Sequence, residues 1–432
     1  MAQSLNEVIS AQIEHVNKNV PMLFERDHMF YSWVDAGNEG VVISRRDMRC
    51  PMELRPGGQF SYASLSGESL GRGTGTMFTY SSLRTVETAL ALEWDFEAEW
   101  STDNRRKAVM DAVKRNIVTG MDEYARHVEG QAMGKGNGIL ATASANISSG
   151  VVRFDNDGFG AKLLRPQQKV DIYASGSNTK RSGNFYIQSI AEDFKSAVVT
   201  SNRAGMGSGG QTAPSGTHAT GIQNGDRFVA SKAVINDDSK NLRGVAYHAD
   251  WSSTGSWQGL NRANFPEIRV SHVDANKAIS LSFPRRVVNY IGDRLGDDAA
   301  NDLVAWMHPS QIQAFEMLGQ SLITISKKAS AEGLNLYFDP KKLTIAGVNV
   351  MKSFMWDRRR IDFTAKSKWG RATMKQPKFI QGQSGGKTFD VYASDGGVET
   401  SVLAYVLGSY QFFHKLPSCG AVVHNLRVPT GY

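Results

Sequence analysis

The chain has 432 residues, of which 41% are hydrophobic and 21% are charged, as is typical of a globular protein. Because a chain of this length is longer than one hydrophobic core usually supports, we expect two or three packed units. The formal net charge of +7 fits a surface that meets nucleic acid but falls well short of a dedicated binder. No apolar run is long enough for a membrane span, and the start of the chain lacks the pattern of a signal peptide. We therefore expect a soluble, intracellular chain whose two cysteines, Cys50 and Cys419, are free thiols.

Residues 1–50 form the first section, an N-terminal arm. Ser4–Glu7 fits a capping box, and the apolar stripe that follows predicts a short amphipathic helix that ends at Pro21. The rest of the section, from residue 24 to residue 49, is mixed and shows no clear core pattern.

Residues 51–80 form a ribbon with a glycine- and serine-rich tip. Phe60, Tyr62, Met77 and Phe78 are typical of strands, so the pattern predicts a two-stranded extended loop. The loop has too few apolar residues to fold against itself, and an isolated hairpin is marginal in water. It is therefore either a mobile surface loop or an arm that lies on another molecule.

Residues 81–140 combine strands with one long helix. From Leu90 to Trp100 apolar and acidic residues alternate, which predicts a half-exposed strand with an acidic outer face. The helix is expected to start at Ser101–Asp103 and to end at Gly134. Its apolar face consists of Val109, Val113, Ile117, Met121, Tyr124, Val128 and Ala132. About 30 residues at 1.5 Å each make a helix of roughly 45 Å, longer than a compact domain needs for its own core.

Residues 141–235 are rich in Gly, Ser, Thr and Asn and contain short β-like runs. The expected strands are 151–154, 169–173, 184–190, 197–200 and 226–229. Turn clusters separate these strands, which is typical of a small all-β barrel or sandwich. We interpret this section as an inserted β-domain.

Residues 236–385 alternate helix and strand, and residues 386–432 are rich in strands around a turn at 394–397. The pattern predicts a helix over 283–295, a buried strand over 303–307, a helix that starts at His308 and a strand over 343–351 with a glycine bulge. The predicted fold class is therefore α+β with a small all-β insertion.

Candidate chemistry is sparse. The glycine-rich stretch from Gly71 to Thr76 lacks the Gly-Lys-Ser/Thr ending of a phosphate-binding loop, and no serine stands in Gly-x-Ser-x-Gly. The histidines have no metal-ligand spacing, and capping or packing is favoured over a catalytic role for His308. We therefore expect no enzyme activity, no catalytic residue, no metal and no cofactor. Two basic clusters are solvated, paired with carboxylates or in contact with nucleic acid: Arg105, Arg106, Lys107, Lys114 and Arg115 on the long helix, and Arg358, Arg359 and Arg360.

The order of these parts resembles a known family. An N-terminal arm, an extended loop, a strand pair and a long spine helix precede a mixed α/β domain with the step Leu303-Val-Ala-Trp-Met-His-Pro-Ser-Gln311. This order is similar to that of the major capsid protein of tailed bacteriophages (Caudoviricetes), the Hong Kong 97 fold. The stretch Thr344–Val350, the pair Trp356-Asp357 and the region 369–377 also match, and the resemblance covers nearly the whole chain. Residues 141–235 depart from the minimal family plan and look like an extra inserted domain.

The resemblance implies a structural role. Identical chains would assemble into pentamers and hexamers of an icosahedral shell around double-stranded DNA. Section 81–140 would be the peripheral domain, section 236–385 the axial domain, and section 386–432 would return to their core. The extended loop would lie across the neighbouring subunit through Arg55, Phe60, Tyr62, Glu68, Arg72, Met77 and Phe78. The two basic clusters would face the DNA without reading its bases.

The resemblance also implies partners and a location. The partners would be other copies of the chain, portal and scaffolding proteins, the packaged DNA and a possible decoration protein, with no membrane. The chain would be assembled in the cytoplasm of a bacterial host and reside in the virion capsid. Because only a short helix precedes the loop, we expect the N-terminus to be retained in the mature particle. Two alternatives stay open: an encapsulin-type nanocompartment shell, and a β-rich protein that binds carbohydrate or nucleic acid.

Overall fold

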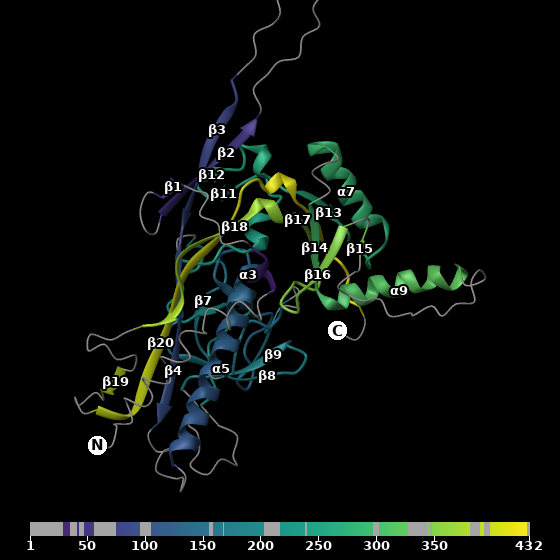
Figure 1. The fold of residues 1–432 in the computed structure, drawn as a ribbon. Helices are drawn as coiled ribbons and strands as arrows, with labels where there is room; N and C mark the ends of the chain where they lie inside the picture. Colours follow the sequence, from purple (N-terminus) through teal and green to yellow (C-terminus); the bar gives the residue numbers. More distant parts are fainter. Residues whose placement is uncertain are drawn as a thin grey trace, which may run out of the picture. The chain divides into compact units, whose positions relative to one another are not determined.

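The computed structural model describes residues 29–34, 41–42, 47–55, 75–95, 105–154, 159–166, 168–202, 217–237, 240–296, 302–326, 344–345, 348–380, 389–392 and 398–429 (Figure 1). These residues divide into two compact units. Unit 1 holds the described residues of Met1–Ala36, Thr85–Gly244 and Arg371–Gln411, and unit 2 holds those of Gly37–Arg84, Val245–Gly370 and Phe412–Tyr432. The predicted helix near the N-terminus and the tip of the extended loop lie outside the described residues.

Unit 1 contains the predicted spine helix, α5 (Arg105–Met133), which has 29 residues. Its apolar stripe from Ile117 to Ala132 is buried, with no member more than 4% exposed. A spacing of three or four residues returns to the same side of a helix, so this confirms the predicted face. The helix ends directly before Gly134, as predicted. The predicted start at 101–103 and the side chains of Val109 and Val113 lie outside the description.

Two glycines mark where α5 is packed closely. A Cβ atom added at Gly120 would lie 2.5 Å from Leu92 Cδ2, and one added at Gly130 would lie 2.3 Å from Leu163 Cδ2. Leu92 belongs to the strand that runs beside the helix, and Leu163 belongs to the β-rich section. The helix therefore packs directly against both.

The sheet beside α5 consists of β4 (Val86–Asp95), β18 (Trp369–Phe379), β19 (Phe389–Tyr392) and β20 (Val398–His414) (Figure 1). Its order is β18-β20-β19, and β4 also pairs with β20, antiparallel, from Val86↔Tyr410 to Asp95↔Ser401. Within the predicted range, Leu92 is buried and Ala91 is exposed, which agrees with a half-exposed strand. The side chains from Glu93 to Trp100 lie outside the description.

A short N-terminal helix, α3 (Met29–Trp33), is anchored in unit 1. Phe30 and Tyr31 are at most 1% exposed. Residues 29–33 therefore contribute to the core, although the sequence of residues 24–49 showed no core pattern. The amide of Phe30 donates to Glu129 Oε1 on α5 (3.2 Å). The ring of Tyr31 meets that of Tyr410 edge to face, with centroids 5.3 Å apart. These partners are far away in the chain, which is why a local pattern did not reveal them.

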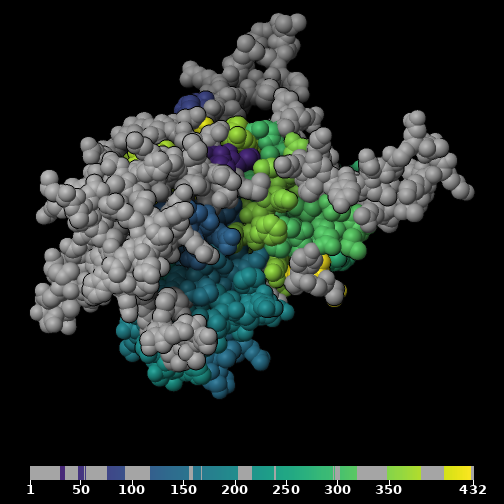
Figure 2. Space-filling model, turned by 60° about the horizontal axis from the view of Figure 1, so that its bottom comes forward, coloured from purple at the N-terminus to yellow at the C-terminus, as the bar shows by residue number. Residues whose placement is uncertain are grey.

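The β-rich section forms a closed barrel. Its strands are β5 (Ile139–Thr142), β6 (Val151–Arg153), β7 (Lys169–Tyr173), β8 (Phe185–Ile190), β9 (Ser196–Thr200) and β10 (Arg227–Ala230). The order is β5-β10-β7-β8-β9-β6, and beyond the two edge strands Ala143 forms a bridge with Phe154. The amide of Ser144 also donates to the carbonyl of Arg153 (2.8 Å). Five strands lie within one residue of their predicted bounds, and Figure 2 shows the barrel residues as one contiguous teal region.

Unit 2 is built on a six-stranded sheet in the order β13-β21-β17-β14-β16-β15. The strands are β13 (Ser271–Asp274), β14 (Leu303–Met307), β15 (Thr344–Ile345), β16 (Val348–Lys352), β17 (Ile361–Ala365) and β21 (Ala421–His424). β13 runs parallel to β21 and β14 runs parallel to β16, while the other neighbours are antiparallel.

Two helices supply the apolar cover of this sheet, α7 (Ser282–Leu295) and α9 (Pro309–Ser326). Val287 and Ile291 of α7 and Ile312 and Phe315 of α9 are buried in one cluster with the strand residues, as their spacing predicted. His308 precedes α9, and its Nδ1 accepts the amide of Ser310 (3.0 Å). It therefore caps the helix, as predicted.

One strand prediction was wrong. The sequence predicted a single strand over 343–351 with a glycine bulge, but β15 and β16 pair antiparallel with each other through Ile345↔Val348 and Thr344↔Asn349. Two antiparallel strands therefore take the place of the single predicted strand, and only the strand pairing reveals this.

Smaller elements complete the described part of the chain. They are β1 (Val41–Val42), β2 (Asp47–Arg55), β3 (Met77–Arg84), α6 (Val245–His248), β11 (Ser256–Trp257), β12 (Leu260–Asn261), η1 (Pro266–Ile268), η2 (Lys366–Lys368) and η3 (Pro417–Cys419). Cys50 and Cys419 form no disulfide bond, as predicted, and both are buried. None of the described helices is long and apolar enough to cross a bilayer.

Candidate assembly surface

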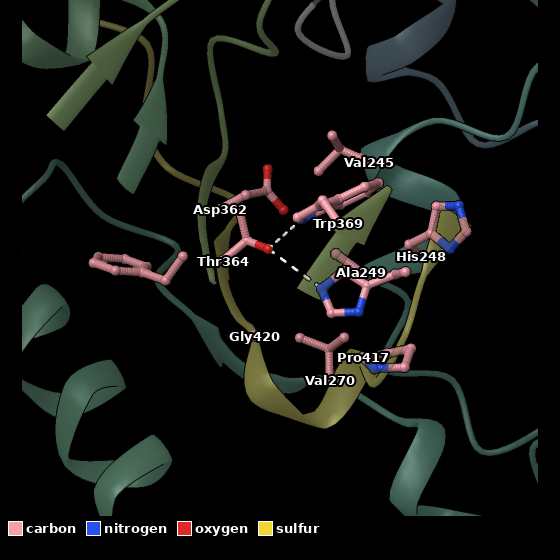
Figure 3. A pocket seen from close by; sticks show the side chains of 11 residues that line it. Val245, His248, Ala249, Val270, Asp362, Thr364, Trp369, Pro417 and Gly420 are labelled. Atoms are coloured by element: carbon pink, nitrogen blue, oxygen red, sulfur yellow. Dashed lines mark hydrogen bonds between the residues drawn. The ribbon is translucent and has the colours of Figure 1, made fainter. Parts of the chain in front are cut away.

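A small pocket in unit 2 is lined by aromatic and histidine side chains (Figure 3). Trp369 Nε1 donates to Thr364 Oγ1 (2.5 Å), and that oxygen lies 3.4 Å from His414 Nε2. Burial, with a smaller contribution from Lys368, lowers the pKa of His414 to about 3, so its ring is neutral at pH 7. The free volume of about 10 Å³ suits roughly one water molecule, whereas pockets for small ligands measure about 300–1,000 Å³. This pocket therefore belongs to the packing of the unit. Across the described residues, no three His, Cys, Asp or Glu side chains are grouped as a metal site would require.

A larger surface lies on the two-stranded ribbon of β2 and β3. The strands pair antiparallel from Asp47↔Arg84 to Arg55↔Met77. In β2 every second side chain is buried, namely Met48, Cys50, Met52 and Leu54. Because successive side chains in a strand point to opposite faces, the ribbon has one buried and one exposed face.

The inner face of the ribbon is packed within unit 2. Met52 and Leu54 join one cluster with Trp257, Leu260 and Ile268, and the Trp257 side chain is fully buried. The amide of Ser82 on β3 donates to the carbonyl of Gln258 (2.9 Å), which ties the strand to the turn between β11 and β12. The base of the ribbon is therefore held firmly from one side.

The outer face carries large apolar side chains in contact with solvent. Phe78 and Tyr80, two residues apart in β3, are 70% and 51% exposed. The guanidinium of Arg49 lies over the Tyr80 ring, 4.4 Å from its centroid. Burying a Phe or Tyr side chain completely is worth about 1.5–3 kcal/mol, so this face would gain by meeting another surface. We call this face, formed by Arg49, Pro51, Phe78 and Tyr80, the outer ribbon face.

Comparison with solved structures shows what architecture these parts form. The chain is similar to a chain of the cyanophage A-1(L) capsid asymmetric unit at 10% identity and a TM-score of 0.50, over 92% of this chain and 93% of that chain. The chain has the Hong Kong 97 capsid fold. A capsid chain of an empty GTA particle (9% identity, TM-score 0.42, 93% and 90% covered) and a chain of Mycobacterium phage Che8 (8%, 0.42, 92% and 92%) are also similar. No protein-family model and no curated protein matches the chain.

The capsid fold gives the predicted interface residues their context. Met77 and Phe78 are both exposed on β3, and Phe78 lies on the outer ribbon face. Arg55 ends β2, with its side chain outside the description. Four further predicted interface residues lie outside the described residues: Phe60, Tyr62, Glu68 and Arg72.

Sequence reasoning missed three members of the outer ribbon face, Arg49, Pro51 and Tyr80. A signal for the first two was present, because Asp47–Arg55 alternates strictly between polar or proline residues and apolar ones. This alternation falls across the boundary that we had set at residue 50 between the arm and the loop. The strand was therefore divided between two sections.

The structure describes the side chains of only one of the two predicted basic clusters. Arg105, Arg106, Lys107, Lys114 and Arg115 all lie in the first part of α5, and their side chains lie outside the description. Arg359 is exposed and Arg358 is half-buried. Arg360 is only 7% exposed, and its Nη2 lies 2.7 Å from Asp362 Oδ1. The expectation that Arg360 faces DNA is therefore corrected, because its charge is already paired inside unit 2.

Proposed function

We propose that this chain is the major capsid protein of a tailed phage. Copies of the chain assemble through pentamers and hexamers into an icosahedral shell that encloses double-stranded DNA. The protein acts as a structural component of the virion and not as an enzyme. Its proposed partners are further copies of itself, portal and scaffolding proteins, the packaged DNA and a decoration protein, and its assembly takes place in the host cytoplasm.

The outer ribbon face is the observation that supports assembly most directly. The inner face of the same ribbon is packed on Trp257, while Phe78 and Tyr80 on the outer face remain more than half exposed. A monomer rarely leaves neighbouring large apolar side chains uncovered unless they meet a partner. In a shell of identical chains, a neighbouring copy would cover this face, and every copy would repeat the same burial.

The test is to express the full chain and examine it by negative-stain electron microscopy and light scattering. We expect closed shells of megadalton mass. A stable monomer or small oligomer under all assembly conditions would overturn the proposal and favour a binding protein of another class. Shells that enclose a protein cargo and exclude DNA would overturn the DNA part and favour a nanocompartment.

A further inference from the structure

Three loops of unit 2 meet at one edge of its six-stranded sheet. β13 and β21 are parallel, so their carboxyl ends lie at the same edge, and residues 275–277 and 425–427 follow these ends. β17 is antiparallel to β21, so the segment 357–360 that precedes it reaches the same edge. Ligand sites in sheets with parallel strands often lie beyond the carboxyl ends of those strands.

Hydrogen bonds hold the three loops together. The amide of Leu426 donates to the carbonyl of Arg359 (2.9 Å), and the amide of Arg427 donates to the carbonyl of Lys277 (2.9 Å). Gln311 Nε2 on α9 donates to the carbonyls of Arg358 (2.7 Å) and Arg427 (3.1 Å). The backbones that carry four cationic side chains are therefore fixed close to one another. We call Lys277, Arg358, Arg359 and Arg427 the basic edge.

The cations of the basic edge are available to solvent. Lys277, Arg359 and Arg427 are exposed and Arg358 is half-buried. Within the described part of the chain, Lys277, Arg358 and Arg427 form no ion pair. The Nε of Arg358 is buried and has no hydrogen-bond acceptor among the described atoms. This donor therefore lacks the oxygen partner that buried polar groups usually have.

Two carboxylates belong to the same loops and strand ends. Asp357 Oδ1 accepts the amide of Arg359 (2.8 Å), and burial raises the pKa of Asp357 to about 6. Asp274 Oδ1 accepts from Asn425 Nδ2 (3.0 Å) and lies 3.9 Å from His424 Nδ1. The four cations thus outnumber the two carboxylates, which already have hydrogen-bond partners. The basic edge keeps a net positive charge.

We propose that the basic edge binds the phosphate backbone of duplex DNA. Guanidinium groups form forked hydrogen bonds with phosphate oxygens, and several fixed cations suit a polymer with a high density of negative charge. The contact is independent of base sequence, since it uses phosphates alone. The inference rests on the proposed function, because it names the residues through which the shell would hold its DNA. Compared with the cluster predicted from the sequence, the proposed DNA contact keeps Arg358 and Arg359 and adds Lys277 and Arg427. It leaves out Arg360, which is paired with Asp362.

The test uses the full-length chain and a triple variant, Lys277→Gln with Arg358→Gln and Arg427→Gln. The matched control removes three exposed cations on other elements, Arg153→Gln with Lys195→Gln and Arg285→Gln. Binding of a short labelled duplex is measured by fluorescence anisotropy at several salt concentrations. Each phosphate contact contributes about 0.9 to the slope of log affinity against log salt. When the salt concentration rises from about 50 to 200 mM, the affinity of each protein falls. The factor by which it falls should be about 40 times smaller for the triple variant than for the original chain.

Circular dichroism and microscopy of both variants separate this inference from the proposed function. We expect the triple variant to remain folded and to form shells while it binds DNA weakly, and we expect the control to bind like the original chain. A triple variant with an unchanged salt slope, or a control with an equal loss, would overturn the basic edge. Binding of polyglutamate but not of duplex would also overturn it and favour an acidic protein partner. Absence of shells from the original chain would instead overturn the proposed function, and the duplex measurement would remain valid.

Discussion

The barrel and the ribbon are both made of short antiparallel strands, but they bury their apolar side chains in different ways. The barrel closes through the Ala143–Phe154 bridge, so its edges are paired and its apolar residues surround one interior. Phe154 and Phe228 meet there edge to face, with centroids 5.2 Å apart. The ribbon buries one face on Trp257 and leaves Phe78 70% exposed on the other. The comparison predicts that a closed β-section folds by itself, whereas a two-stranded ribbon depends on what covers it.

The largest expected effect comes from changing the outer ribbon face. The double substitution Phe78→Thr with Tyr80→Thr should abolish shell formation, because it removes the exposed apolar area while keeping β-branched strand residues. The unassembled chain should keep its stability, since surface changes of this kind usually stay within about 0.5 kcal/mol each. Microscopy and thermal melting measure the two effects. The control Val151→Thr with Met374→Thr changes exposed strand residues elsewhere and should still give shells. Normal shells from the ribbon variant would contradict the comparison.

The next effect concerns independent folding. Residues 139–235 expressed alone should give a cooperative melt and dispersed amide NMR signals, because the barrel strands pair with one another. Residues 47–84 expressed alone should remain unfolded, since the ribbon then lacks Trp257 and the rest of its inner-face cluster. A random-coil spectrum for the barrel fragment would show that the barrel needs α5 for its stability, for example through the close contact of Leu163 with Gly130.

A single chemical change in both regions sharpens the contrast. Phe228→Ala in the barrel interior should lower the free energy of unfolding by about 3–5 kcal/mol, because the side chain is fully buried. Phe78→Ala should change the free energy of unfolding of the unassembled chain by only about 0.5 kcal/mol. Urea denaturation of both variants gives the values. Equal losses would mean that Phe78 is already covered within the subunit.

A further effect is a pH dependence of the stability of unit 2, which holds the ribbon. His414 has a folded-state pKa of about 3, so between pH 6.5 and 3 the unfolded chain takes up a proton that the folded chain does not. Its contribution to stability is therefore lost as the pH falls through this range, by about 1.4 kcal/mol per pH unit. His414→Asn keeps an acceptor for the amide of Leu416, which His414 Nδ1 now accepts (3.1 Å). The stability difference between the two proteins should be flat above pH 6.5 and should shrink below it. Parallel curves would exclude His414 as the source.

The sequence by itself determined the elements whose signal is local. The face of α5 from Ile117 to Ala132, five barrel strands and the capping role of His308 all follow from spacing or from a helix start. Helix and strand periodicities are properties of neighbouring residues, so these predictions needed no knowledge of distant partners. The order of the sections was likewise enough to indicate the capsid fold.

Tertiary structure decided which faces are buried and which charged side chains are paired within the subunit. Only the pairing of β15 with β16 distinguished two antiparallel strands from a single bulged strand, and only the contact with Asp362 removed Arg360 from the surface. The basic edge exists because β13 and β21 are parallel neighbours, which places Lys277 beside Arg427. Burial and charge pairing arise between residues that are distant in the chain, and strand order alone determines which of them meet.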